Sequence, residues 1–383
     1  MTSTLIPPPA APSTDTTHAI AVAPELEPDD LILSARDSGI WASADAGITW
    51  RQVFDAGSPN QRITATCLAV TPAVTGPRTI FAGAFGTVVK SIDGGQRWRA
   101  IALPRPAPLV TCLAVSPAHD EDGVILAGTL EDGVLRSDDR GEHWKRWNFG
   151  LLDLSIYAIV PSPAFAQDDT IFAGTETALF KSENGGRSWR ETPFPETAAP
   201  VLALTIDHDR TFWAGTDGHG IWHSTDDGAS WRQASDGAID GAVNGFVVTG
   251  DSLLAVLPET ILISHDQGQH WHPAITDLSD GGGIAGVAAL RDQAAHGRRS
   301  IAAHEQLADA VDAPFSVLKG LRDAQRRVPF GRYSSAATAA IAPGSSPENH
   351  SGSAGTTLLI QLRDGSVRHH RLDPDKDVGK GNR

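Results

Sequence analysis

Short apolar runs separated by polar turn residues recur along most of the chain. From residue 110, the runs VTCLAVSP, VILAGTL and GVLRS follow one another, and WKRW closes the unit. Gly, Asp and Pro separate the runs, which is typical of β-strands joined by tight turns. Val134 and Arg136 alternate with Leu135 and Ser137, which indicates a sheet with two different faces. The segment therefore predicts a four-stranded antiparallel sheet.

A polar motif, Ser-x-Asp-x-Gly-x-(Thr/Ser)-Trp, closes the third run of most units, and we call each copy a repeated turn. It is complete in two copies and slightly changed in four, at 43–50, 224–231, 91–98, 137–144, 182–189 and 264–271. Successive copies are 40 to 48 residues apart, and six of the ten tryptophans end a copy. A four-stranded sheet repeated at this period is the signature of a propeller blade.

The runs predict seven blades. Complete units begin near residues 17, 62, 109, 155, 199 and 242. A seventh begins at 283–290, is interrupted, and resumes at 357–372 without a repeated turn. We expect an all-β, seven-bladed propeller over 17–290 and 357–372, between an N-terminal segment (1–16) and a C-terminal tail (373–383). The segment around Thr4–Pro7 is a candidate for the outer strand that the last blade lacks.

Residues 291–356 interrupt the last blade. Residues 291–332 are compatible with helices that carry apolar stripes, and they contain eight basic and five acidic residues. The rest of the insertion is rich in Ser, Ala, Gly and Pro, as flexible segments are. Long insertions in tight repeats are often functional. We expect an α-helical arm that docks a partner or a second ring, although a loop folded over its own propeller also fits. Its anchoring residues would be Arg298, Arg299, Arg326 and Arg327.

The motif resembles the Asp-box, or bacterial neuraminidase repeat. That repeat is found in sialidases, xyloglucan-cleaving glycosidases, sortilin-type receptors and photosystem II assembly factors. The resemblance covers 17–275 strongly and the last blade weakly. It implies a structural turn between the third and fourth strands, in which the acidic residue binds turn amides and Gly takes a positive φ. The residues given this structural role are Asp45, Asp93, Asp139, Asn184, Asp226 and Asp266.

Charge and composition exclude several classes of function. The net charge of −15 argues against a non-specific nucleic-acid binder. No apolar stretch is long enough to span a membrane, and no signal-peptide pattern is visible, so we expect a cytoplasmic protein. The two cysteines, Cys67 and Cys112, hold the same repeat position, which favours buried thiols. We expect no metal site and no cofactor, although His219 with His223 and the histidines around Asp266 form two metal-like groupings.

Acidic and polar residues gather in loops that a propeller places on one face. Loops that join second to third strands share a face with the entrances of the inner strands, and the repeated turns lie on the opposite face. We expect an acidic rim that docks a basic protein partner, although turn residues in water are the simpler interpretation. The loop residues are Asp37, Glu131, Asp132, Glu176, Asp217, His219 and Glu259. The residues expected at the channel mouth are His18, Tyr157 and Asn244.

These patterns favour a non-catalytic scaffold, assembly factor or protein-binding platform, to which we assign no catalytic residue. The alternative is a glycoside hydrolase, either sialidase-like or with two rim carboxylates across a cleft. The resemblance implies that sialidase chemistry needs three arginines and a Tyr–Glu pair. No arginines occupy equivalent inner-strand positions, and Tyr157 is the one tyrosine on an inner strand. Binding of nucleic acid or insertion into a membrane is not expected, whereas self-association through 291–356 remains open.

Overall fold

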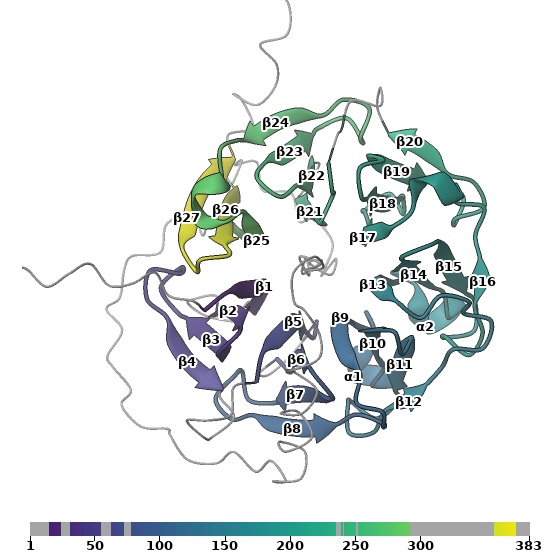
Figure 1. Cartoon of the computed structure of the whole chain (residues 1–383), viewed down its shortest axis with the longest axis horizontal. Coiled ribbons are helices and arrows are strands. Elements are labelled where there is room, and N and C mark those ends of the chain that lie inside the picture. The colour runs from purple at the N-terminus through teal and green to yellow at the C-terminus, as the bar shows by residue number, and fades with distance from the viewer. Residues whose placement is uncertain are drawn as a thin grey trace, which may run out of the picture.

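Seven antiparallel sheets are arranged radially around one axis, so the protein is a seven-bladed β-propeller (Figure 1). The computed structural model describes residues 15–23, 31–54, 63–72, 78–234, 239, 241–249, 252–291 and 356–372. The fold class expected from the repeat is confirmed.

The first four blades each contain four strands in chain order from the axis outward. Blade 1 is formed by β1 (Thr17–Ala23), β2 (Leu31–Arg36), β3 (Gly39–Ser43) and β4 (Arg51–Phe54). Blade 2 is formed by β5 (Ala65–Val70), β6 (Ile80–Ala84), β7 (Thr87–Ser91) and β8 (Arg99–Ala102). Blade 3 is formed by β9 (Leu109–Val115), β10 (Ile125–Leu130), β11 (Val134–Ser137) and β12 (Lys145–Arg146). Blade 4 is formed by β13 (Ile156–Pro161), β14 (Ile171–Thr175), β15 (Leu179–Ser182) and β16 (Arg190–Glu191).

The last three blades complete the ring. Blade 5 is formed by β17 (Val201–Ile206), β18 (Phe212–Thr216), β19 (Ile221–Ser224) and β20 (Arg232–Ala234). Blade 6 is formed by β21 (Gly245–Thr249), β22 (Ser252–Val256), β23 (Ile261–Ser264) and β24 (His272–Ile275). Blade 7 is formed by β25 (Ile284–Arg291), β26 (Thr356–Leu362) and β27 (Val367–Leu372). The short helices are α1 (His119–Asp122), α2 (Phe165–Asp168) and the 3-10 turns η1 (Glu196–Ala198) and η2 (Ser279–Gly281).

The blades pack face to face, and this explains the alternation seen in the sequence. All four residues of β11 are buried. Val134 belongs to the core between blades 3 and 4, whereas Leu135 belongs to the core between blades 2 and 3. The two faces of a strand therefore contact two neighbouring blades. The inner strands β25 and β1 are also neighbours, which closes the ring.

The repeated turns share one hydrogen-bond pattern. In blade 5 the Ser224 hydroxyl donates to Asp226 Oδ1 (2.8 Å) and accepts the Gly228 amide (2.9 Å), while Asp226 Oδ1 accepts the Ser230 amide (2.8 Å). Hydrogen bonds from Ser230 and Ser224 lower the pKa of Asp226 to about 2. The other five turns repeat the three bonds. The side chains that accept the turn amides are Asp45, Asp93, Asp139, Asn184, Asp226 and Asp266.

Each repeated turn also joins its blade to the preceding one. The Trp231 ring of blade 5 packs edge-on to Phe172 of blade 4, with centroids 6.5 Å apart. Gly228 has φ +81°, and a Cβ there would lie 2.6 Å from Phe172 Cε1. Gly is therefore needed at this position both for its backbone conformation and for the approach of the aromatic ring.

The inner strands approach each other closely at the cysteine position. Cys67 and Cys112 are free and buried, as predicted, and burial raises the pKa of each thiol to about 12. A Cβ on Gly128, opposite Cys112, would lie 2.7 Å from Ile156 Cγ2 of the next blade. The absence of a side chain at Gly128, on the second strand, thus leaves room for Cys112 and for the inner strand of the next blade.

Blade 7 differs from the others. Within the described residues its sheet has three strands, and β27 is more exposed than the third strands of other blades. The outer strand expected from Thr4–Pro7 lies outside the described residues, as do most of the insertion at 291–356 and the tail at 373–383.

The two faces of the ring are set by the alternating direction of the strands. We call the face with the repeated turns the turn face and the opposite one the rim face. The Arg140 amide of a repeated turn donates to Gly123 O, directly after α1, and the Gly185 amide donates to Asp169 O, directly after α2. Connections from first to second strands therefore lie on the turn face. Arg291 and Thr356, which flank the insertion, lie at such a connection, on the side opposite the rim face.

Replacing Gly228 by Ala tests the double constraint on the repeated turn. We expect Gly228→Ala to lower the free energy of unfolding by about 2–4 kcal/mol, because left-handed strain and overpacking against Phe172 add. Gly218→Ala is the matched control: its φ is +80°, but nothing lies within 4 Å of its added Cβ. The control should lose only about 1 kcal/mol in urea unfolding. Equal losses in the two variants would show that the contact with blade 4 is unimportant.

Candidate partner-binding surface

The loops of the rim face are held by threonines at the ends of second strands. Thr129 Oγ1 donates to Gly133 O (2.6 Å), Thr175 Oγ1 to Ala178 O (2.9 Å) and Thr216 Oγ1 to Gly220 O (2.7 Å). These bonds shape the hairpin loops of blades 3, 4 and 5. Five of the residues expected at the rim are exposed: Glu131, Glu176, Asp217 and His219 on these loops, and Glu259 on the corresponding loop of blade 6.

Asp132 has a structural contact instead of a free carboxylate. Arg146 Nη2 lies 3.1 Å from Asp132 Oδ1, and the same guanidinium donates to carbonyl oxygens of Pro104 and Pro106. The pair therefore ties the rim loop of blade 3 to the loop that enters this blade. Asp132 stabilises the rim, and the neighbouring Glu131 carries its exposed charge.

His18 and Asp37 form a pair at the start of blade 1. His18 Nε2 lies 2.8 Å from Asp37 Oδ1, and the Thr16 amide donates to Asp37 Oδ2 (3.2 Å). Burial raises the pKa of Asp37, but the hydrogen bonds and charge of His18 and the bonds from Thr16 outweigh it and hold this pKa below its usual value. The sequence expectation placed both residues on the binding surface, and the structure places them in contact with each other.

Tyr157 is not available at the channel mouth, which corrects the expectation. Its side chain is 3% exposed. It occupies the bulge between Ile156 and Ala158 on β13. At the equivalent position of blade 2, Thr66 Oγ1 donates to Val110 O of the next inner strand (2.6 Å). This bulged position therefore serves contacts between blades, and burial of a large aromatic ring there is favourable.

Asn244 is half-buried at the entrance of blade 6. Its backbone amide donates to Val256 O (2.8 Å), which anchors this entrance to the second strand.

The loop 147–155, which joins blade 3 to blade 4, exposes apolar side chains that the sequence pattern did not single out. Phe149 is 79% exposed, Leu152 82% and Leu154 37%. Among the described residues, the other large apolar side chains with comparable exposure are Ile48 and Ile92, both in repeated turns. The signal in the sequence was the run NFGLLDLS, in which apolar residues do not alternate as in a strand.

Several hydrogen bonds fix this loop to the rim on both sides. The Gly133 amide donates to Leu154 O (2.9 Å), and the Thr177 amide and hydroxyl both donate to Asp153 Oδ2 (2.9 and 2.8 Å). The loop is thus held between the hairpin that carries Glu131 and the hairpin that carries Glu176. We call the exposed side chains of Leu152, Leu154, Glu131 and Glu176 the rim patch. Phe149 lies at the other end of the loop, where its carbonyl oxygen accepts a hydrogen bond from the Trp189 amide (2.9 Å), at the end of blade 4's repeated turn.

The remaining residues singled out in the sequence have local partners or lie elsewhere. His270 Nδ1 lies 2.6 Å from Asp266 Oδ2 within a repeated turn, and His265 Nδ1 lies 2.8 Å from the Ser252 hydroxyl. In the part of the chain that the structure describes, no three His, Cys, Asp or Glu residues are placed to hold a metal ion. The arm residues Arg298, Arg299, Arg326 and Arg327 lie outside that part.

Solved structures share the fold at low sequence identity. A GH74 xyloglucanase from Xanthomonas campestris is 21% identical with a TM-score of 0.55, and the match covers 68% of this chain and 45% of the enzyme. YCF48 bound to a D1 peptide is 17% identical with a TM-score of 0.50, covering 68% of this chain and 81% of YCF48. YCF48 from Cyanidioschyzon merolae is 15% identical with a TM-score of 0.50, covering 73% and 90%.

At these identities the similarity establishes the propeller fold alone. This chain spans less than half of the xyloglucanase. No protein-family model matches the sequence, and no curated protein matches it. None of the helices in the described ranges is both long and apolar enough to cross a membrane.

The His18–Asp37 pair predicts an acid-dependent loss of stability. Because the folded pKa of Asp37 lies below its unfolded value, the contribution is fully present above about pH 4 and disappears as the pH falls through the folded pKa. Asp37→Asn should cost about 1 kcal/mol at pH 7 and weaken the dependence of unfolding on pH between 4 and 2. Urea unfolding across this range measures both effects.

Glu259→Gln, at an exposed rim position, is the control and should follow the wild-type curve. An Asp37→Asn curve that stays parallel to the wild type would rule out this pair as the origin of the pH dependence.

Proposed function

We propose that this protein is a non-catalytic propeller scaffold or assembly factor that binds another protein through its rim face. The observation that carries the proposal is the rim patch. Large apolar side chains are seldom exposed together on one loop of a protein without a partner. Here they lie on a loop fixed by hydrogen bonds, so binding would order few additional groups.

The charges of the rim patch suggest the chemistry of the partner. Glu131 and Glu176 are exposed on the hairpins that hold the apolar loop, and neither forms an ion pair within the described residues. A protein segment with apolar side chains flanked by Lys or Arg would complement this surface. The net charge of −15 favours the same partner through long-range attraction.

The contacts at the rim weigh against the glycoside hydrolase alternative. Asp132 is bound by Arg146, and the Tyr157 side chain is buried, so two residues that such chemistry would need have structural contacts. The GH74 xyloglucanase is similar in fold, as is YCF48, whose structure contains a D1 peptide. The peptide-bound propeller supports the proposal of a protein partner here.

We extend the proposal to the Asp-box family, to a cytoplasmic location and to an arm at 291–356 that makes a second contact or joins two rings. The shared hydrogen bonds of the six repeated turns support the family. Arg291 and Thr356 lie at a connection on the turn face, so the arm leaves and re-enters the ring on the side opposite the rim loops.

Variants of the rim patch test the platform. Affinity purification with cross-linking from the native source should return a stoichiometric protein partner. With that partner purified, Leu152→Ser/Leu154→Ser should weaken binding by more than tenfold, as loss of buried apolar anchors does. Glu131→Gln/Glu176→Gln should weaken binding less and reduce its dependence on salt. Calorimetric titration at two salt concentrations measures both effects.

Ile48→Ser/Ile92→Ser, which removes exposed apolar side chains from the turn face, is the matched control and should bind as the wild type does. Two results would contradict the proposal: unchanged affinity in both rim variants, or turnover of a glycoside panel that Glu131→Gln or Glu176→Gln abolishes.

Removal of the insertion tests the arm separately. Arg291 and Thr356 are paired across β25 and β26, so an Asn-Gly turn can replace 292–355. We expect a folded ring with an unchanged melting temperature and a weaker affinity for the partner. Circular dichroism and the same titration measure these outcomes. Unchanged affinity and an unchanged oligomeric state would show that the arm contacts neither the partner nor a second ring.

A further inference from the structure

A pair of basic residues recurs on the outer strands of three blades. The residue before the Ser of the repeated turn is basic in blades 2, 3 and 4, and the fourth-strand residue paired with it is also basic. These pairs are Lys90 with Arg99, Arg136 with Lys145, and Lys181 with Arg190. Like charges opposite each other on neighbouring strands are destabilising, so a contact with a carboxylate would stabilise each pair.

Between blades 2 and 3 that contact is a carboxylate. Glu142, which follows the Gly of blade 3's repeated turn, lies 2.7 Å from Lys90 Nζ through Oε1 and accepts a hydrogen bond from Arg99 through Oε2. The Lys90 side chain is only 8% exposed. Burial raises the pKa of Glu142, but the hydrogen bonds from Lys90 and Arg99 outweigh it and lower this pKa below its usual value. Glu142 therefore bridges two cations across the junction of two blades.

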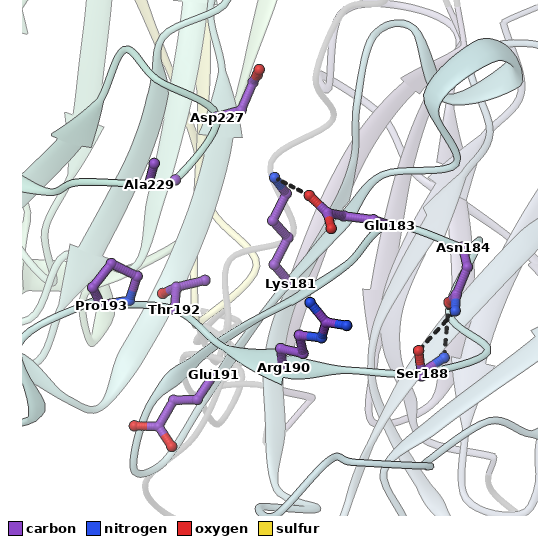
Figure 2. Close-up of a pocket in the computed structure, with 11 residues that line it drawn as sticks. Lys181, Glu183, Asn184, Ser188, Arg190, Glu191, Thr192, Pro193, Asp227 and Ala229 are labelled. Carbon is purple, nitrogen blue, oxygen red and sulfur yellow. Dashed lines mark hydrogen bonds and ion pairs between the residues drawn. The ribbon is translucent and has the colours of Figure 1, made fainter.

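Between blades 4 and 5 the same two cations are present, but the next blade supplies no carboxylate to bridge them. Glu183 of blade 4 lies 2.9 Å from Lys181 Nζ, and the hydrogen bond and charge of Lys181, with the charge of Arg190, lower its pKa. The position of Glu142 is taken by Ala229 in the repeated turn of blade 5. A cleft of about 410 Å³ opens there, lined by Lys181, Arg190, Asp227 and Ala229 among others. Figure 2 shows the Lys181 and Arg190 side chains next to each other on adjacent strands, across the cleft from Ala229.

We propose that this cleft binds a carboxylate presented by another polypeptide, in the place that Glu142 occupies between blades 2 and 3. The carboxylate would accept hydrogen bonds from Lys181 Nζ and the Arg190 guanidinium, as Glu142 does from Lys90 and Arg99. Charge-assisted hydrogen bonds to two cations are stronger than those between neutral groups. The same arrangement of two cations thus occurs twice, with a carboxylate from the next blade between blades 2 and 3 and without one between blades 4 and 5.

Other carboxylates at the cleft set its selectivity. Glu183 Oε1 lies 2.9 Å from Lys181 Nζ, but its side chain is 63% exposed, and exposed ion pairs contribute little to stability. A ligand carboxylate can therefore displace Glu183 at small cost. Asp227 and Glu191 also line the cleft and would repel a highly acidic segment. The ligand that fits is a single Asp or Glu side chain, or a C-terminal carboxylate, flanked by neutral or basic residues.

This site lies beside the repeated turn of blade 5, and none of the rim-patch residues lines it. The inference goes beyond the proposed function and does not rest on it, since the rim variants and the cleft variants change different residues.

Titration of the full chain with short peptides tests the site. One probe carries a single Glu between blocked ends, a second carries a free C-terminal carboxylate and no acidic side chain, and a blocked Gln peptide is the control. In NMR spectra, we expect at least one carboxylate probe to shift the Lys181 Nζ and Arg190 Nε resonances until the shift saturates. The Gln peptide should leave both resonances unchanged. The probe that binds identifies the source of the carboxylate.

Two sets of variants give opposite expectations. Ala229→Glu should supply the missing bridge, raise the melting temperature and weaken probe binding at least tenfold, and Lys181→Met/Arg190→Met should abolish binding. Glu142→Ala should create a second site of the same kind. The inference is overturned if neither carboxylate probe gives a saturable shift, or if binding persists unchanged in Ala229→Glu or in Lys181→Met/Arg190→Met.

Discussion

The packing of each blade against its neighbour is the contact on which the whole ring depends. A single four-stranded sheet cannot bury its two apolar faces alone, and stacking neighbours around an axis buries both. The repeated turn makes this packing specific, because its Trp enters the space between two blades and its Gly leaves room for an aromatic ring, as Trp231 and Gly228 do against Phe172. The hydrogen bonds of Asp226 then hold the turn in the shape that both contacts require.

Because so many residues serve that packing, binding is expected where the repeat departs from its pattern. The loop 147–155 exposes apolar side chains. Ala229 leaves two cations without the carboxylate that Glu142 supplies between blades 2 and 3. In both places hydrogen bonds hold the chain around the departure, which favours a surface that is organised before any ligand binds. In a repeat protein, a candidate functional residue can therefore be compared with the residues at the equivalent position of the other repeats.

Much of the fold could be predicted because strands and turns depend on residues close in sequence. The seventh blade was expected from 283–290 and 357–372, and its strands are Ile284–Arg291, Thr356–Leu362 and Val367–Leu372. The candidate site was predicted less well. The exposure of Glu131 and Glu176 was expected from their turns, whereas the burial of Tyr157 was not. A bulged position can face the channel or the next blade, and local sequence does not distinguish the two.

The sequence by itself determined the number of blades, the limits of most strands and the shape of the repeated turns, because these follow from periodicity and from hydrogen bonds over about four residues. Only the tertiary structure decided how the charges are used. Arg146 binds Asp132, His18 binds Asp37, and Lys90 binds Glu142 from the next blade. The Lys90–Glu142 contact joins residues a full blade apart, so it forms only when the ring brings neighbouring blades face to face.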